Sequence, residues 1–206
     1  MKQDIIYVSP SSEMQLIYIN NTKSSWIKII KLTPQQALSI PEFEELWYMR
    51  PDEKHLIRIA GKLITCPRYT KSYLKGYNFS GLENKADMNM PESIEKLLTF
   101  ARQFNPDLNQ SLVNWYDIGG SIGKHSDDVR QLKPHSDIFS FSFGPAIRTF
   151  ILEPKNKEIN STYHIRVEDN TMIIMGGHCQ MTHFHSVPKV KDNTDRRINV
   201  TFRCFL

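Results

Sequence analysis

Cysteines and long apolar runs are scarce in this sequence of 206 residues. Its three cysteines (Cys66, Cys179 and Cys204) are odd in number and widely spaced, which argues against a disulfide framework and favours reduced thiols. No stretch approaches the roughly 20 apolar residues of a membrane span, and the first residues lack the apolar core of a signal peptide. We therefore expect an intracellular protein, in the nucleus or the cytoplasm, with no membrane partner.

The length favours one domain. A chain of this size buries roughly 70% of the surface that it exposes when unfolded, so it can be stable without a structural metal ion. Any metal that it binds is therefore expected to be functional rather than structural.

Acidic residues are missing between Lys54 and Leu82, although the whole chain is only mildly basic, with 26 Lys and Arg against 22 Asp and Glu. Cations and aromatic rings alternate through this stretch: Lys54, Arg58, Lys62, Arg68, Tyr69, Lys71, Tyr73, Lys75, Tyr77 and Phe79. Cations that follow a phosphate backbone, together with rings that stack on bases, are typical of a nucleic-acid surface. A solvated basic loop over packed tyrosines fits the composition equally well.

The first half of the chain mixes strands and helices. Residues 1–32 alternate apolar and polar side chains and predict strands, and Thr33 and Pro34 predict the start of a helix that ends before Pro51. Residues 56–59 and 62–65 flank Ala60-Gly61 and predict a hairpin. Pro91 opens a second predicted helix, whose buried face is Ile94, Leu97, Leu98 and Ala101.

From Asn109 onward the pattern changes to short strands separated by turn residues. The predicted strands are 111–118, 139–143, 149–153, 163–167, 171–175 and 198–205. Many short strands at regular spacing are typical of a sandwich or a jelly-roll barrel. With helices that precede the barrel, the fold class is α+β.

The pair His125 and Asp127 is a candidate metal site. If they lie on a strand, the imidazole and the carboxylate point to the same side. A second, distant histidine would complete the two-His, one-carboxylate set of non-haem iron(II) oxygenases. His178, His183 and His185 are all candidates for it.

Strict alternation from Arg197 to Arg203 places two arginines on one face of a strand. Arg197, Asn199, Thr201 and Arg203 share that face, and Ile198, Val200 and Phe202 share the other. If the apolar face is covered, both guanidinium groups point into the barrel and need anions, which a dicarboxylate cosubstrate would supply. Asn114 and Tyr116 place an amide and a phenol on one face of another strand, where they could meet carboxylate oxygens. The alternative is that residues 197–203 form an exposed edge strand and that solvent hydrates both arginines.

Together these motifs resemble the AlkB-like family of Fe(II)/2-oxoglutarate-dependent dioxygenases. The resemblance runs from about Ile59 to Arg203, whereas the first thirty or so residues match nothing in that family. The stretches that carry it are Pro67-Arg68, Tyr77-Asn78-Phe79-Ser80-Gly81, Asn114-x-Tyr116, Ile122-Gly123-x-His125-x-Asp127-Asp128, Ser140-x-Ser142-Phe143-Gly144, His185-x-Val187-Pro188 and Arg197-x-Asn199-x-Thr201-Phe202-Arg203.

The resemblance implies a single domain over residues 1–206, with a double-stranded β-helix (jelly-roll) core. Residues 1–55 would form an N-terminal extension with a helix, 56–90 a nucleotide-recognition lid, and 91–206 a helix plus the core. It implies that Fe(2+) is bound by His125, Asp127 and His185, with His185 preferred because it precedes Val187-Pro188. Arg197, Asn199 and Tyr116 would hold the distal carboxylate of 2-oxoglutarate, with Asn114 and Arg203 near its metal-chelating end.

The same resemblance implies oxidative demethylation of N-alkylated bases in DNA or RNA, with O2 and 2-oxoglutarate consumed and formaldehyde, succinate and CO2 released. The substrate residues would be Arg68, Tyr77, Phe79, Ser80 and Asp128, with a flipped base between the rings and His125. Ala60, at the tip of the predicted hairpin, has a side chain too small to fill the gap left when a base is flipped out of a duplex. This favours single-stranded DNA or RNA as the substrate. Val129 stands where several members carry a carboxylate that reads the base, a role that Asp128 could take over. We expect a monomer.

Three alternatives remain open at this point. The chain could be a 2-oxoglutarate-dependent hydroxylase or demethylase that acts on protein, a nucleic-acid-binding module without catalysis, or a zinc hydrolase with the same three ligands. The basic lid argues against the first, and the complete set of ligands and both arginines argue against the second. A zinc hydrolase would leave Arg197 and Arg203 without a function.

Overall fold

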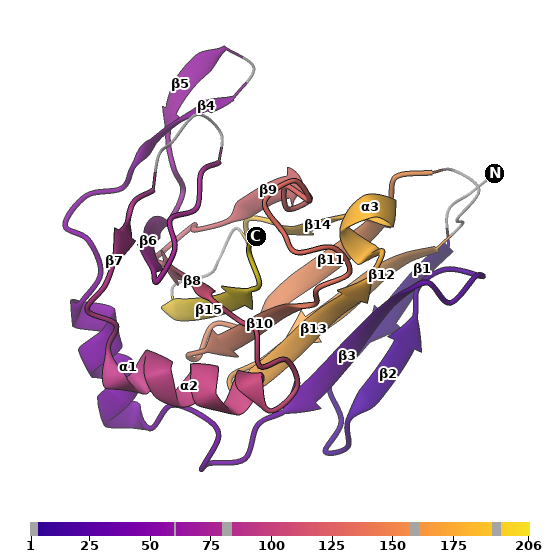
Figure 1. The fold of residues 1–206 in the computed structure, drawn as a ribbon, viewed down its shortest axis with the longest axis horizontal. Coiled ribbons are helices and arrows are strands. Elements are labelled where there is room, and N and C mark those ends of the chain that lie inside the picture. Colours follow the sequence, from indigo (N-terminus) through magenta and orange to yellow (C-terminus); the bar gives the residue numbers. More distant parts are fainter. Residues whose placement is uncertain (1–3, 60, 80–83, 157–160, 191–194) are drawn as a thin grey trace.

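The fold consists of two β-sheets that pack face to face and a hairpin that projects beyond them (Figure 1). It is known from a computed structural model, which describes residues 4–59, 61–79, 84–156, 161–190 and 195–206. The larger sheet has the strand order β2 (Gln15–Tyr18), β3 (Ser25–Lys31), β13 (Thr171–Gly177), β10 (Ile138–Phe143), β15 (Arg197–Arg203), β8 (Gln110–Tyr116), β6 (Tyr69–Tyr73) and β7 (Ala86–Asp87). The smaller has the order β1 (Asp4–Val8), β12 (Ser161–Val167), β11 (Arg148–Pro154), β14 (His183–Val187) and β9 (Ile122–His125). The predicted α+β fold with a jelly-roll core is confirmed.

The two faces of the larger sheet are buried in different ways. Its outer face packs on α1 (Ile40–Tyr48) and α2 (Glu92–Arg102), through a cluster that joins Leu46 and Leu97 to Val200. Its inner face packs on the smaller sheet, where Ile173 and Met175 share a cluster with Leu152. Because both faces are covered, side chains that alternate along β15 or β8 are buried on either side.

β15 has the alternation that the sequence predicts. Ile198, Val200 and Phe202 belong to the cluster under the helices, while Arg197 and its polar companions line a pocket between the sheets. The strand is paired on both sides, with β10 and with β8, so its backbone is held rigidly.

The first helix begins later than predicted. Thr33 and Pro34 lead into a turn, and α1 starts after Ser39, whose side chain accepts a hydrogen bond from the Glu42 backbone amide. The Glu42 carboxylate accepts from the Ser39 backbone in return, and this reciprocal capping box stabilises the later start. α1 ends at Tyr48, before Pro51 as predicted, and α2 follows Pro91 with the predicted buried face.

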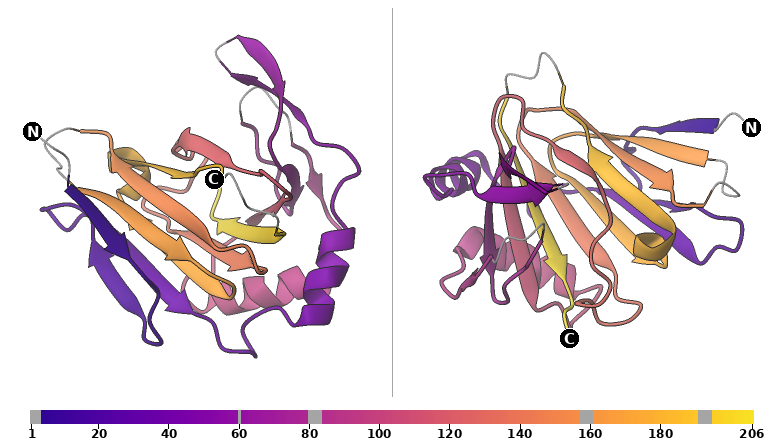
Figure 2. Two further views of the ribbon diagram at one scale, coloured as in Figure 1. Left: turned by 180° about the vertical axis from the view of Figure 1, so that it is seen from behind. Right: turned by 90° about the horizontal axis from the view of Figure 1, so that it is seen from above.

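The predicted hairpin is also present, as β4 (Leu56–Ile59) and β5 (Lys62–Thr65), which pair with each other and with no other strand among the described residues. It rises away from the two sheets (Figures 1 and 2), and Ile57, Arg58, Ile59 and Ile64 of the hairpin line the pocket. Its predicted tip residue, Ala60, lies outside the described residues.

Strands near the N-terminus extend both sheets, which confirms the strand pattern predicted for residues 1–32 within its described part, residues 4–32. β1 pairs in parallel with β12, and β3 pairs antiparallel with β13 (Figure 2). A third helix, α3 (Cys179–Thr182), makes one turn between β13 and β14. Among the described residues, every helix is too short or too polar to cross a membrane.

Candidate active site

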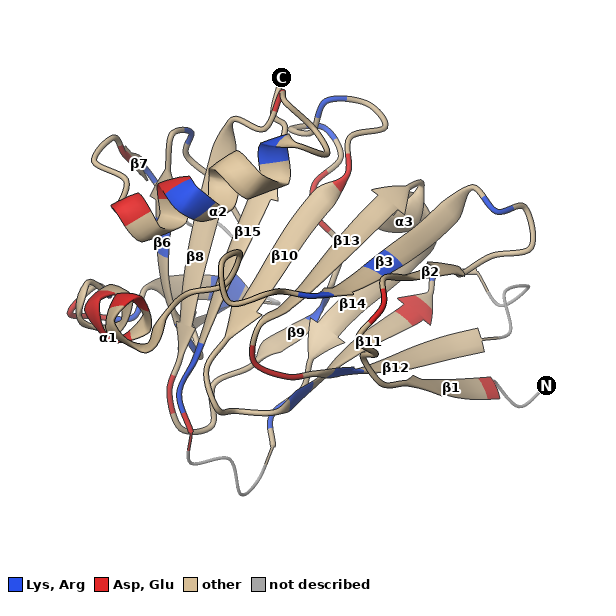
Figure 3. Cartoon of the chain, turned by 90° about the horizontal axis from the view of Figure 1, so that it is seen from below, with Lys and Arg blue, Asp and Glu red and all other residues tan. Residues whose placement is uncertain are grey.

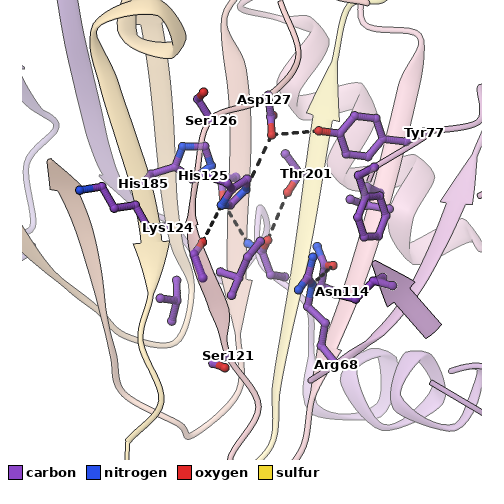
Figure 4. A pocket seen from close by; sticks show the side chains of 18 of the residues that line it. Arg68, Tyr77, Asn114, Ser121, Lys124, His125, Ser126, Asp127, His185 and Thr201 are labelled. Carbon is purple, nitrogen blue, oxygen red and sulfur yellow. Dashed lines mark hydrogen bonds and ion pairs between the residues drawn. The ribbon is translucent and has the colours of Figure 1, made fainter. Parts of the chain in front are cut away.

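A cavity of about 1260 Å³ opens between the two sheets below the hairpin. Its walls combine residues of β8, β9, β14 and β15 with residues of the predicted lid, and Figure 4 shows some of the side chains that line it. Charged and amide groups line part of it, because the inward faces of β8 and β15 carry Asn114, Arg197, Asn199 and Arg203.

His125, Asp127 and His185 meet in this cavity. Their potential ligand atoms all lie within 4.8 Å of one another, and Nε2 of His125 is 3.9 Å from Oδ1 of Asp127. The pairing of β14 with β9 sets His185 directly opposite His125, with ring centroids 4.2 Å apart. Asp127 is not on a strand as expected, since β9 ends at His125; the following loop turns its carboxylate back toward the rings (Figure 4).

The protonation of these groups suits a divalent metal. Burial, together with the neighbouring His125, lowers the pKa of His185 to about 3, and burial also lowers the pKa of His125. Both imidazoles are therefore neutral near pH 7, as metal ligation requires. Burial opposes ionisation of Asp127, but the charge of Arg203 and the nearby histidines outweigh it and hold its pKa well below the usual range. Two neutral imidazoles and one carboxylate fit an iron(II) site.

Hydrogen bonds orient two of the three potential ligands, His125 and Asp127. Nδ1 of His125 is 2.8 Å from the carbonyl oxygen of Gly123, which leaves Nε2 for the metal. Arg203 donates from Nε to Oδ2 of Asp127 at 2.7 Å, and the Tyr77 hydroxyl donates to Oδ1 at 3.1 Å. The sequence suggested that both arginines need an external anion, but Arg203 already has one in Asp127.

Arg197, by contrast, keeps donors that no side chain or backbone group in the described part of the chain accepts. Its Nη2 donates to Oγ of Ser142 at 2.8 Å, and its guanidinium lies 4.9 Å from the ring centre of Tyr116. Its Nε and Nη1 are buried without a partner in that same part of the chain. A buried cation with vacant donors needs an anion, and the carboxylate of 2-oxoglutarate fits that need.

The two asparagines are engaged in different ways. Oδ1 of Asn114 accepts a hydrogen bond from Nε of Arg68 at 2.9 Å. Nδ2 of Asn199 donates to Oγ of Ser140 at 2.9 Å and to the carbonyl oxygen of Phe141 at 2.7 Å. Asn199 therefore links β15 to β10 through hydrogen bonds, in addition to any contact that it makes with a ligand.

The predicted substrate residues are partly assembled at the mouth of the cavity. Phe79 is half-buried, with its ring 5.6 Å from that of Tyr77 and 5.7 Å from the guanidinium of Arg68. Asp128 lines the cavity and pairs with Arg130, whose hydrogen bonds lower the Asp128 pKa to about 2. Ser80 lies outside the described residues.

The other candidate histidines lie apart from the cluster of His125, Asp127 and His185 in the described part of the chain. Nδ1 of His183 is 2.8 Å from Oγ1 of Thr182, and burial lowers the His183 pKa to about 4. His178 instead lies beside His135, with ring centroids 5.3 Å apart.

Three residues near the site were missed by the sequence analysis. Arg148, on β11, is 1% exposed and donates from Nη2 to the carbonyl oxygen of Pro188 at 2.6 Å. Gln180 and Lys155 contact the loop that carries Asp127. For Gln180 and Lys155 no local sequence pattern indicates a role, because their partners are distant in sequence. Arg148 could have been noticed, because it is an arginine within an otherwise mostly apolar strand.

Comparison with known proteins agrees with this site. The family described as the 2OG-Fe(II) oxygenase superfamily matches residues 42–203. Human DNA oxidative demethylase ALKBH2 is 31% identical over 162 residues, which cover 73% of this chain and 61% of that protein. Rat alpha-ketoglutarate-dependent dioxygenase alkB homolog 3 is 39% identical over 103 residues, 46% of this chain and 35% of that protein. This chain thus spans less than two thirds of the length of either relative.

Solved structures give the same fold. The structure of OsALKBH1 matches with a TM-score of 0.58 at 17% identity, covering 92% of this chain and 99% of that one. A 2OG-Fe(II) oxygenase family oxidoreductase from Burkholderia pseudomallei matches with a TM-score of 0.53 at 16% identity, covering 85% and 84%. From its fold, its site and the family match, the chain belongs to the 2OG-Fe(II) oxygenase superfamily, and its relatives place it among the AlkB-like members, as its motifs predicted.

Proposed function

We propose that this protein oxidatively demethylates N-alkylated bases in nucleic acid, using Fe(2+), 2-oxoglutarate and O2. The observation that carries the proposal is the presence, in one cavity, of the three-residue metal cluster and the partly unsatisfied guanidinium of Arg197. The names of the relatives, a DNA oxidative demethylase and a dioxygenase of the alkB type, support the same reaction.

His125, Asp127 and His185 would hold the iron on one side of the cavity. Bound there, iron(II) would activate O2 with 2-oxoglutarate as reductant, yielding succinate and CO2, and oxidise an N-methyl group that leaves as formaldehyde. Arg203 keeps Asp127 ionised, and Arg203 and Tyr77 together orient its carboxylate.

Arg197 would bind the distal carboxylate of 2-oxoglutarate through Nε and Nη1. Tyr116, beside that guanidinium, and Asn199, on the same strand face, would complete this end of the cosubstrate site. Asn114 and Arg203 would lie nearer the metal-chelating end. The buried guanidinium supplies binding energy and orientation, since a charged hydrogen bond is strongest where water is excluded.

The lid would receive the nucleic acid. Phe79 offers a half-buried ring at the mouth of the cavity, Arg68 and Asp128 lie nearby, and Ser80 follows Phe79 in the chain. The Tyr77 ring is already in contact with Arg203 and its hydroxyl with Asp127, so we assign base stacking mainly to Phe79 and a wall of the pocket to Tyr77.

Charge distribution favours a polyanion at the lid. The stretch from Lys54 to Leu82 contains cations and no acidic residue, whereas α1 on the far side of the larger sheet carries Glu42, Glu44 and Glu45 (Figure 3). We propose a single-stranded substrate, DNA or RNA, and a monomeric enzyme.

The test is incubation of the pure protein with Fe(II), 2-oxoglutarate and methylated oligonucleotides, single- and double-stranded, followed by mass spectrometry of the products. Loss of a methyl group with matching amounts of formaldehyde and succinate is expected, faster on single strands. Succinate formation stimulated by methylated protein and by no oligonucleotide would contradict the proposal.

A further inference from the structure

The backbone of Asp127 is held by a side chain from another part of the chain. Asp127 lies in the loop after β9, so no strand pairing fixes its main chain. Its amide N–H donates instead to Oε1 of Gln180 at 2.9 Å. The other end of that carboxamide, Nε2, lies 3.4 Å from the sulfur of Met175, which turns the oxygen toward Asp127. Gln180 is buried, 8% exposed, so water does not readily replace it.

A lysine connects the same two segments a second time. Nζ of Lys155, just beyond β11, donates to Oγ of Ser126 at 2.8 Å and to the carbonyl oxygen of Gln180 at 2.7 Å. Ser126 is the residue between His125 and Asp127. A single ammonium group therefore holds the loop that carries Asp127, directly after the strand that ends at His125, against α3, the helix that carries Gln180.

α3 also leads directly into the strand that carries the third potential ligand. It ends at Thr182, and β14, with His185, begins at the next residue. Gln180 and Lys155 thus join the segment of Asp127 to the segment of His185, which are otherwise distant in sequence. Residues that orient metal ligands in this way commonly affect metal affinity by about 10–100-fold when they are replaced.

We propose that Gln180 and Lys155 are positioning residues that set the distance between Asp127 and His185 and thereby the affinity of the site for a divalent metal. The proposal rests on the proposed function only in assigning a metal to His125, Asp127 and His185. It does not depend on which substrate is oxidised.

The experiment measures the dissociation constant of Mn(II), added alone to the full-length metal-free protein, by calorimetry and by the electron paramagnetic resonance signal of the free ion. The variants are Gln180→Leu, which removes the acceptor; Gln180→Glu, which retains an acceptor oxygen; and Lys155→Met. Thr182→Val is the matched control, because its hydroxyl belongs to α3 but bonds to His178, Ser25 and His183 rather than to the Asp127 loop. Thermal melting of each metal-free variant measures stability separately.

We expect Gln180→Leu to weaken Mn(II) binding roughly 10–100-fold, Lys155→Met to weaken it less, and Gln180→Glu to restore it to within a few-fold of the unmodified protein. Thr182→Val should bind Mn(II) almost normally, even if its melting temperature falls. If Gln180→Leu does not fold, Lys155→Met provides the same comparison.

Normal Mn(II) binding by both Gln180→Leu and Lys155→Met would overturn the proposal, as would an equal loss in Thr182→Val. Failure of the unmodified protein to bind Mn(II) would overturn it together with the metal assignment. If the variants rank as expected while no methylated oligonucleotide is demethylated, the positioning role stands and only the proposed substrate is wrong.

Discussion

Arg203 and Asp127 form an ion pair at the bottom of the cavity, with Nε and Oδ2 2.7 Å apart and side-chain exposures of only 6% and 2%. The pair lowers the pKa of Asp127, so the carboxylate stays ionised even though it is buried. Arg203 would therefore support a metal bound by Asp127, whatever it contributes to cosubstrate binding.

Replacing Arg203 by Leu should weaken metal binding and also destabilise the metal-free protein. Removing one partner of a buried ion pair commonly costs about 3–5 kcal/mol, because the other charge is left buried and uncompensated. Calorimetric Mn(II) affinity and urea unfolding of the same samples measure the two effects. Unchanged Mn(II) affinity would show that the pair has no role in metal binding.

Arg197→Met should have the opposite effect on stability. It removes a buried guanidinium whose Nε and Nη1 have no partner among the described residues, so the metal-free protein should melt at a higher temperature. The loss of charged hydrogen bonds to a carboxylate, worth about 1.5–3 kcal/mol, should raise the KM for 2-oxoglutarate roughly 10–100-fold. Oligonucleotide binding should be almost unchanged, and equal damage to both ligands would contradict the role given to Arg197.

His185→Ala should abolish turnover and Mn(II) binding while the fold persists, because the apolar clusters of both sheets form without a metal. Circular dichroism and thermal melting of the metal-free variant report the fold. A variant that fails to fold would indicate a structural rather than a functional histidine.

Substitutions of Tyr77 and Phe79 should affect metal binding and substrate binding separately. Tyr77→Phe removes one donor to Asp127 and should weaken Mn(II) binding about fivefold, in line with the roughly 1 kcal/mol that a single hydrogen bond contributes. Phe79→Ala should leave Mn(II) binding intact and weaken binding of a methylated single strand by about 1–3 kcal/mol, the usual contribution of one stacked base. The reverse pattern in the two variants would exclude this division of roles.

His183 should make the metal-free protein sensitive to acid. Burial lowers its pKa from 6.5 to about 4 in the folded state, so between these values the unfolded chain binds more protons and stability falls as pH falls. The expected loss from this group between pH 7 and pH 4 is about 3 kcal/mol. In His183→Gln this part of the pH dependence should vanish, as measured by urea unfolding at several pH values; an unaltered slope would exclude His183 as its source.

Many of the residues that meet in the cavity could be predicted from the sequence, because their signals are local. The alternation along β15 and the spacing of His125 and Asp127 depend on neighbouring residues alone, and the structure brings these residues together. The partners of Asp127 could not be predicted in this way. Arg203, Tyr77 and Gln180 are each at least 50 residues away from it, and only the folded sheets bring them within hydrogen-bond distance.

The late start of α1 has a similar physical origin. Thr33 followed by proline is a good helix start in isolation, but Ser39 and Glu42 form a reciprocal cap six residues later. The later start also places Phe43, Leu46 and Trp47 against the larger sheet. Packing thus selected between two acceptable starts, and the sequence pattern alone gave no means of ranking them.

The three strands before α1 widen the two sheets and also cover strand edges that could otherwise pair with other molecules. β1 and β3 satisfy the outer backbone groups of β12 and β13, two long strands of the barrel. Without them, rows of unpaired N–H and C=O groups would be open to strands of other molecules. A shortened chain that begins at α1 would keep every metal and cosubstrate residue named above and would nevertheless be prone to aggregate.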